Sequence, residues 1–115
     1  MLTDSSVLVL DDEEIMREIL ESLLAKEGYH VRSAASGPEA VEAAREDIFD
    51  AAIVDLMMPG MSGLEALDEL RKIDFDLPVI MITAFGTSGN TREAFKRGAF
   101  DFLEKPFKND DVLIA

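Results

Sequence analysis

Residues 7–28 read VLVLDDEEIMREILESLLAKEG and set the architecture of the chain. The stretch opens on four apolar residues in a row, passes through an acidic turn and continues with apolar residues at the spacing of one helix face. It closes on Gly28, a favourable residue for ending a helix because glycine adopts a left-handed conformation at little cost. The stretch therefore predicts a strand followed by a helix that packs on a sheet.

The same alternation of short apolar runs and helical patterns continues along the rest of the chain. The further runs lie at residues 30–34, 51–54, 79–82 and 100–103. Pairs with the spacing of a capping box, or a close variant of it, predict three more helix starts: Ser36 with Glu39, Ser62 with Glu65, and Asn90 with Glu93. Gly98 would end the last of these helices after about two turns.

Alternating strands and helices with short connections force parallel strands and right-handed crossovers. For five strands this predicts an α/β fold, a single-domain doubly wound parallel sheet with helices on both faces and the flavodoxin-like strand order 2-1-3-4-5. The runs at 30–34 and 100–103 mix polar with apolar residues, as edge strands do, whereas the other three are apolar throughout. A chain of 115 residues is one domain, so residues 1–115 are taken as a unit.

Composition excludes several classes of protein. The chain has 11 Lys and Arg against 24 Asp and Glu, a net charge of −13, which repels the phosphates of nucleic acid and of anionic lipid. It has no cysteine, no basic and apolar leader of the secretory kind, and no apolar run near the ~20 residues of a membrane span. We expect a cytoplasmic protein that contacts neither nucleic acid nor membrane directly.

Polar side chains follow four of the five predicted strands: Asp11 and Asp12, then Asp55, Thr83 and Lys105. Ligands of doubly wound sheets bind beyond the carboxyl ends of the strands, so these residues define the candidate site. Three carboxylates gathered there would repel one another unless a cation intervened. Oxygen ligands without histidine or cysteine favour a hard ion, Mg²⁺ or Mn²⁺.

Asp55 differs from the other two acids because apolar residues flank it on both sides, and burying an ionised group there is costly without a compensating partner. We interpret it as a nucleophile that attacks phosphorus and forms an aspartyl phosphate. Lys105 would supply a fixed cation for the transferred group, and the Thr83 hydroxyl would donate to a phosphoryl oxygen.

Each of these residues also has an ordinary structural explanation. Asp11 with Glu14 resembles a capping box, Asp55 is placed to open a turn at residues 59–60, Thr83 is a common residue at a strand end, and Lys105 alone reads as a solvated surface charge. The hypothesis that all of these structural explanations hold at once is weaker than that of a common site, because the predicted fold places these residues on one rim of the sheet.

The chain resembles the receiver domain of two-component response regulators. The motifs that carry the resemblance are VLDDE at residues 9–13, VDLMMPGMSG at 54–63, ITA at 82–84 and KPF at 105–107, with all four needed for a specific match. The resemblance implies that Asp55 accepts a phosphoryl group from the phosphohistidine of a sensor histidine kinase. It also implies that Asp12, Asp55 and the backbone carbonyl of Met57 bind Mg²⁺ directly, and that Asp11 acts largely through water.

The resemblance further implies a switch, in which Thr83 moves toward the phosphoryl group and the ring of Phe102 turns inward. Phe102 stands where many relatives have tyrosine, so no mechanism that needs that hydroxyl carries over. Residues 108–115 would form only about two turns of the last helix, so we expect it to be truncated at Ala115. Weak similarity to receivers of ATPase-type activators favours a transcriptional output.

The expected function is therefore a phosphorylation switch that controls an output domain or downstream protein; its own chemistry is limited to self-phosphorylation and slow self-dephosphorylation. Whether phosphorylation drives formation of a homodimer stays open. A binding module that signals without phosphate is the first alternative, and the complete set of site residues argues against it. An aspartate-nucleophile phosphatase needs an acid two residues after the nucleophile, where this chain has Met57. A flavin phosphate would be repelled by the acidic turn at residues 11–14.

Overall fold

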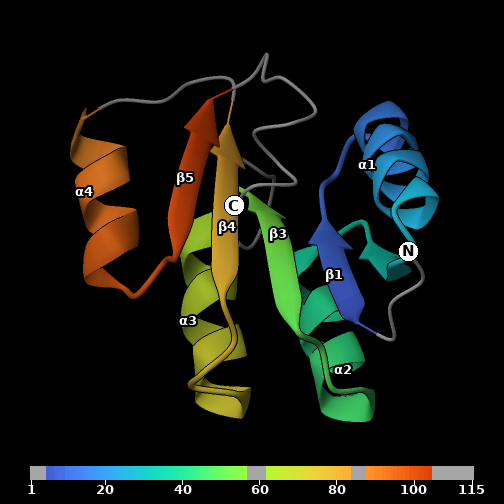
Figure 1. The fold of residues 1–115 in the computed structure, drawn as a ribbon. Coiled ribbons are helices and arrows are strands. Elements are labelled where there is room, and N and C mark those ends of the chain that lie inside the picture. Colours follow the sequence, from blue (N-terminus) through green and yellow to red (C-terminus); the bar gives the residue numbers. More distant parts are fainter. Residues whose placement is uncertain (1–4, 57–61, 84–87, 105–115) are drawn as a thin grey trace.

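The computed structural model describes residues 5–56, 62–83 and 88–104. Strands and helices alternate along the chain, as the apolar runs predict (Figure 1). The elements are β1 (Ser6–Leu10), α1 (Glu14–Lys26), β2 (His30–Ala34), α2 (Gly37–Glu46), β3 (Ala51–Asp55), α3 (Gly63–Ile73), β4 (Val79–Thr83), α4 (Ser88–Lys96) and β5 (Asp101–Glu104). Every predicted strand is present, with ends that differ from the prediction by no more than one residue.

The strands form one parallel sheet in the order β2-β1-β3-β4-β5. The first four strands of this order confirm the predicted arrangement, and β5 pairs in parallel with β4 at the far edge. Because all strands run in the same direction, their carboxyl ends lie along one rim of the sheet (Figure 1). The mixed run at residues 30–34 does lie at an edge, next to β1.

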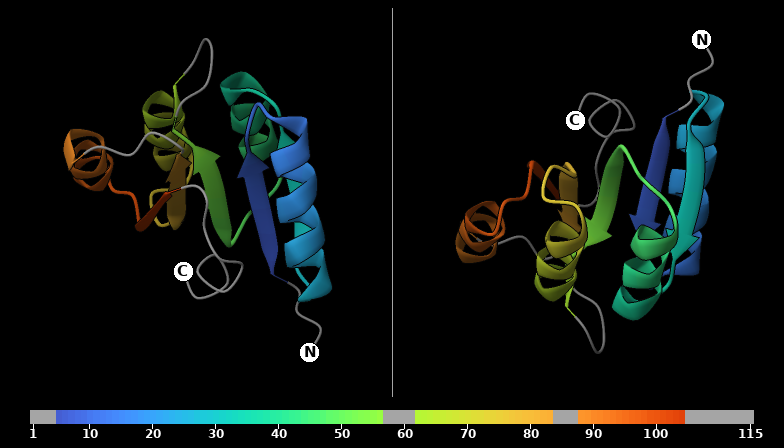
Figure 2. Two further views of the ribbon diagram at one scale, coloured as in Figure 1. Left: turned by 90° about the horizontal axis from the view of Figure 1, so that it is seen from above. Right: turned by 90° about the horizontal axis from the view of Figure 1, so that it is seen from below.

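Helices cover both faces of the sheet, and the side chains of each strand alternate between the two layers. On one face, Leu20 and Leu24 of α1 pack with Val9 and Ile53. On the other face, α2 and α3, with Leu67 of α3 among the contacts, pack on the strand side chains that point away from α1. These are Leu8, Leu10, Ala52, Val54, Val79 and Met81. Figure 2 shows this arrangement from both ends, with α1 across the sheet from α2 and α3.

The predicted helix boundaries are confirmed where capping residues define them. Ser36 and Ser62 are the N-cap residues of α2 and α3, and each hydroxyl accepts a hydrogen bond from the backbone N–H three residues on. In α3 the reciprocal bond of the capping box is also present. Gly28 and Gly98 follow the ends of α1 and α4 with φ of 92° and 98°, the left-handed conformation expected of them.

The start of α4 differs from the prediction. The pair Asn90 and Glu93 predicts an N-cap at Asn90, whereas the helix begins at Ser88 and includes Asn90 in its first turn. First-turn N–H groups have no acceptor within the helix, so Gly89 and Asn90 cost less there than they would in a helix interior. The helix is therefore longer than predicted by part of a turn.

None of the helices that the structure describes is long and apolar enough to span a bilayer. The predicted last helix, residues 108–115, lies outside the described residues.

Candidate functional site

Asp11, Asp12 and Asp55 come together at the carboxyl rim of the sheet. One carboxylate oxygen of each lies within 4.8 Å of the others. The register of the sheet explains why: Leu10 of β1 lies opposite Val54 of β3, so the next residues, Asp11 and Asp55, are neighbours across the two strands. Strands in a sheet lie ~4.8 Å apart, which brings those two side chains into reach of each other.

The two central acids are buried and the third is exposed. Asp11 has no exposed surface and Asp55 is 3% exposed, while Asp12 faces solvent. Buried carboxylates need partners to offset the loss of hydration. Among the described residues no buried side-chain nitrogen or oxygen lacks a hydrogen-bond partner, so Asp11 and Asp55 are satisfied as well as buried.

The loop after β1 holds Asp11 by several hydrogen bonds. Its N–H donates to the carbonyl of Ala34 on β2 at 3.2 Å, which continues the parallel ladder one residue past the strand. Its Oδ1 accepts from the N–H of Glu13 at 2.9 Å, and its carbonyl accepts from Arg17 of α1 at 2.8 Å. The N-cap residue of α1 is Glu13, which has no side-chain cap, so the capping-box explanation of Asp11 with Glu14 is wrong.

Asp55 is the last residue of β3, and α3 approaches its backbone very closely. The N–H of Leu56 donates to the carbonyl of Ile82 at 2.8 Å, which carries the pairing with β4 one residue past Asp55. The N–H of Gly63, at the start of α3, returns to the carbonyl of Leu56 at 2.9 Å. A Cβ on Gly63 would lie 2.2 Å from the carbonyl oxygen of Asp55, so only glycine fits here.

The remaining predicted residues have different placements. Thr83 ends β4, has no exposed surface, and lies one residue beyond Ile82, the register partner of Asp55. Phe102 lies on β5 opposite Met81 of β4. Lys105 and Met57, predicted to contribute a cation and a backbone carbonyl, lie outside the described residues.

Two residues near the site are missing from the sequence-based prediction of its members. The importance of Gly63 could have been inferred from its position directly after the capping serine. Glycine contributes nothing to the stability of a helix, so its presence there suggests that a larger residue would not fit. Arg17 is the only Lys or Arg among residues 1–25, and an isolated cation three residues after the acidic turn at residues 11–14 was the available signal. Neither signal states which backbone atom the residue would meet.

Three carboxylates with oxygens this close form a donor set suited to a hard divalent cation. Mg²⁺ accepts a few carboxylates and fills its other positions with water or a phosphate oxygen, which matches a site that is buried at Asp11 and Asp55 and open at Asp12. The donor set contains neither histidine nor cysteine, so it does not favour Zn²⁺. The residues present therefore fit Mg²⁺ or Mn²⁺.

The fold, the acidic cluster at the strand ends and the sequence define one class of protein. The model of the response regulator receiver domain matches residues 7–115, and the chain belongs to this family. It is thus a receiver domain of the two-component type, as the sequence motifs indicate.

Among curated proteins, the chain is 36% identical over 110 residues to the transcriptional regulatory protein SrrA of Staphylococcus aureus. The match covers 96% of this chain and 45% of SrrA, so the chain spans less than half the length of that relative.

Solved structures of receiver proteins superpose closely on the chain. The chemotaxis protein CheY4 of Vibrio cholerae has a TM-score of 0.92 at 32% identity, covering 97% of this chain and 95% of that one. A response regulator of Burkholderia pseudomallei has a TM-score of 0.92 at 31% identity, covering 97% of this chain and 66% of that one. The Burkholderia structure contains a phosphorylated aspartic acid, a calcium ion and citrate.

Proposed function

We propose that this receiver domain accepts a phosphoryl group on Asp55 in a reaction that requires Mg²⁺. The observation that carries the proposal is the convergence of Asp11, Asp12 and Asp55 within 4.8 Å at the carboxyl rim of the sheet. Support comes from the Burkholderia relative, in which an aspartic acid is phosphorylated and a divalent cation is present. Asp55 is the candidate because it is buried at a strand end and its backbone is held by β4 and α3.

Asp55 acts as the nucleophile in this proposal. One of its carboxylate oxygens forms a bond to phosphorus while the bond from phosphorus to the imidazole nitrogen of a donor phosphohistidine breaks. The imidazole leaves and takes up a proton from solvent. The donor is a sensor histidine kinase, as for two-component systems in general.

Asp11 and Asp12 would hold the cation together with Asp55 and the backbone carbonyl of Met57. Bound Mg²⁺ neutralises the charge that develops on the transferring phosphoryl oxygens. Lys105 supplies a second positive charge to those oxygens, and the Thr83 hydroxyl donates a hydrogen bond to one of them. Water then hydrolyses the acyl phosphate slowly. In this proposal the domain is a switch, and it has no catalytic activity beyond these two steps.

The phosphorylated state would bias a conformational equilibrium. Thr83 and Phe102 are the proposed moving parts, on the neighbouring strands β4 and β5. Because the chain is similar to part of the transcriptional regulator SrrA, we propose that the output it controls is transcriptional. We further propose that this output lies in another domain or protein. We also propose a cytoplasmic location, where such an output operates.

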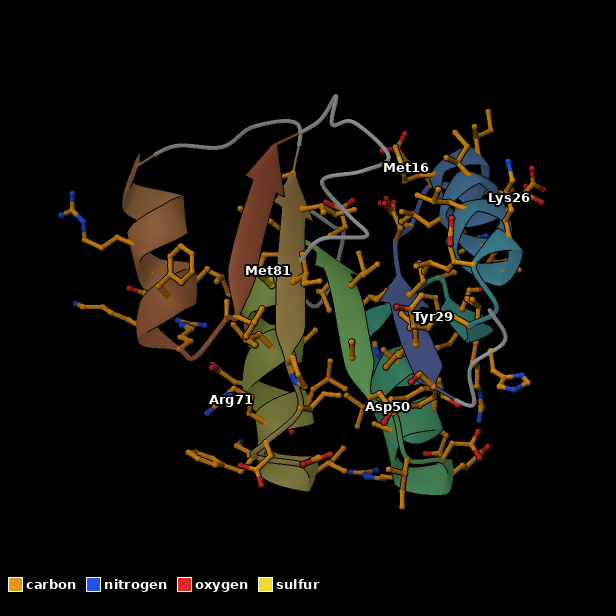
Figure 3. All side chains as sticks on the ribbon, viewed as in Figure 1. Met16, Lys26, Tyr29, Asp50, Arg71 and Met81 are labelled. Atoms are coloured by element: carbon orange, nitrogen blue, oxygen red, sulfur yellow. The ribbon has the colours of Figure 1, made fainter. Side chains whose placement is uncertain are left out.

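The test is phosphate incorporation from a small acyl phosphate in the presence of Mg²⁺, measured by intact mass. Wild type should gain one phosphoryl group, and Asp55→Asn should gain none. Asp50→Asn is the matched control, because Asp50 is exposed and lies at the opposite end of β3 (Figure 3). Incorporation in Asp55→Asn equal to wild type, or none in wild type, would refute the proposal.

A further inference from the structure

Arg17 makes a contact with the acidic loop that the proposed chemistry does not use. It lies one turn into α1, beside Met16, which Figure 3 labels at the carboxyl rim of the sheet. The side chain is half-buried, and its Nη1 donates to the carbonyl oxygen of Asp11 at 2.8 Å. A charged donor makes this hydrogen bond stronger than one between neutral groups.

The carbonyl of Asp11 belongs to the peptide group that joins Asp11 to Asp12. Peptide groups are planar, so a partner that fixes the oxygen also fixes the direction of the Asp12 N–H and the path of the chain into Asp12. Two further bonds of Asp11, from its N–H to Ala34 and from the Glu13 N–H to its Oδ1, hold the residue on either side of that peptide. Arg17 adds a hold on the peptide oxygen itself.

Asp12 depends on this peptide more than its two partners depend on any single contact. Asp11 and Asp55 are enclosed by the sheet and the helices, whereas Asp12 is exposed in the connection between β1 and α1. Its carboxylate nevertheless lies within 4.8 Å of the other two. The backbone that carries Asp12 therefore bears on where this carboxylate lies, and the peptide before Asp12 is the part of that backbone that Arg17 contacts.

We propose that Arg17 is a positioning residue that locks the Asp11–Asp12 peptide and so directs the Asp12 carboxylate into the cation site. This role rests on the proposed function, since it assigns to Arg17 the preorganisation of that same site. Mutation of the outer contacts that orient the ligands of a metal commonly weakens metal affinity by about 10–100-fold.

Electrostatics alone makes the opposite prediction, which gives the test its direction. A guanidinium near a cation site repels the incoming cation, so removing its charge would tighten Mg²⁺ binding if charge were the whole effect. Loss of positioning weakens binding instead. The sign of the change in Kd therefore separates the two effects.

The experiment is calorimetric titration of Mg²⁺ into wild type, Arg17→Met and Arg17→Lys. Arg32→Met is the matched control, because it removes the same charge from β2, where Arg32 pairs with Glu46 and Asp47. We expect Kd to rise about tenfold in Arg17→Met, to rise less in Arg17→Lys, and to stay unchanged in Arg32→Met. Unchanged or tighter binding by Arg17→Met, or equal weakening in Arg32→Met, would overturn the role.

Amide hydrogen exchange of the metal-free protein gives a second readout, independent of cation and phosphate. The N–H groups of Asp11 and Glu13 should exchange faster in Arg17→Met, while that of Val9 in the core of β1 keeps its wild-type rate. An equal acceleration of all three would indicate general destabilisation and contradict the proposal, as would no acceleration.

The two proposals fail in different ways. A wild type that binds no Mg²⁺ and takes up no phosphate would refute the proposed function and Arg17 with it. A wild type that does both, beside an Arg17→Met variant of unchanged Kd, would refute only the role of Arg17.

Discussion

The two ends of the parallel sheet both carry aspartates, but they hold them differently. At the amino end, Asp50 accepts a hydrogen bond from the N–H of Ser6 at 2.7 Å, and Asp47 accepts one from Arg32 at 2.7 Å. Both acids are exposed. The carboxylate of Asp47, followed by that of Glu46, raises the pKa of the Arg32 guanidinium, so Arg32 stays positively charged at all ordinary pH values.

At the carboxyl end, the acids face one another. Asp11 and Asp55 are buried, and both lie within 4.8 Å of Asp12. Like charges at such a separation repel one another. An acidic residue therefore indicates a functional site through what surrounds it: at the amino end the acids lie apart, each beside its own donor, and at the carboxyl end three of them are collected within reach of one cation.

The largest expected effect is on the response of stability to Mg²⁺. Wild type should gain about 2.7 kcal/mol in its free energy of unfolding at a Mg²⁺ concentration one hundred times Kd. Asp12→Asn should lose most of this gain, because it removes a ligand, whereas Asp47→Asn should keep it. Urea denaturation with and without Mg²⁺ measures the difference, and an equal Mg²⁺ response in the two variants would erase the distinction between the ends.

The next effect concerns the contact between α3 and Asp55. Gly63→Ala places a Cβ where the Asp55 carbonyl lies 2.2 Å away, so the backbone must shift. Overpacking of this kind costs about 1–3 kcal/mol, and the shift should also slow phosphate incorporation. Ser62→Ala is the comparison variant: it removes the cap of α3, at about 1 kcal/mol, without crowding Asp55.

Denaturation gives the free energy for both variants, and the initial rate of phosphate uptake gives the effect on the site. If Ser62→Ala slowed uptake as much as Gly63→Ala, the close approach to Asp55 would have no special importance.

The smallest effect is a difference of sign in metal-free protein. Asp12→Asn relieves repulsion within the cluster and should raise the free energy of unfolding by up to about 1 kcal/mol. Asp47→Asn breaks an ion pair with Arg32 and should lower it slightly. Urea denaturation in a chelating buffer measures both, and a loss of stability in Asp12→Asn would show that the acidic cluster is not under mutual repulsion.

The sequence predicts the strands and the acidic cluster because both depend on local patterns. The apolar run at residues 51–54 predicts a buried strand, and the acids that directly follow it and the run at 7–10 share a rim once the strands are parallel. Leu10 and Val54 are the last residues of their apolar runs, and they lie opposite each other in the sheet. The residues that follow them, Asp11 and Asp55, are therefore neighbours.

Other features escape sequence reasoning because they depend on contacts between distant segments. The closeness of Gly63 to the carbonyl of Asp55 depends on how α3 docks. The hydrogen bond from Arg17 to Asp11 depends on the path of the loop between β1 and α1. The start of α4 at Ser88 contradicts the pair at Asn90, because a capping-like pattern states only a local preference.

The central claim is that the carboxyl rim gathers three aspartates into one cation site. The most direct test is an anomalous diffraction experiment on crystals of the protein grown with Mn²⁺, which substitutes for Mg²⁺ in oxygen-ligand sites. We predict one strong anomalous peak among the three carboxylates, in contact with those of Asp12 and Asp55 and beside that of Asp11. Ordered carboxylates with no peak between them at saturating Mn²⁺, or a peak only at exposed acids such as Asp47 and Asp50, would contradict it.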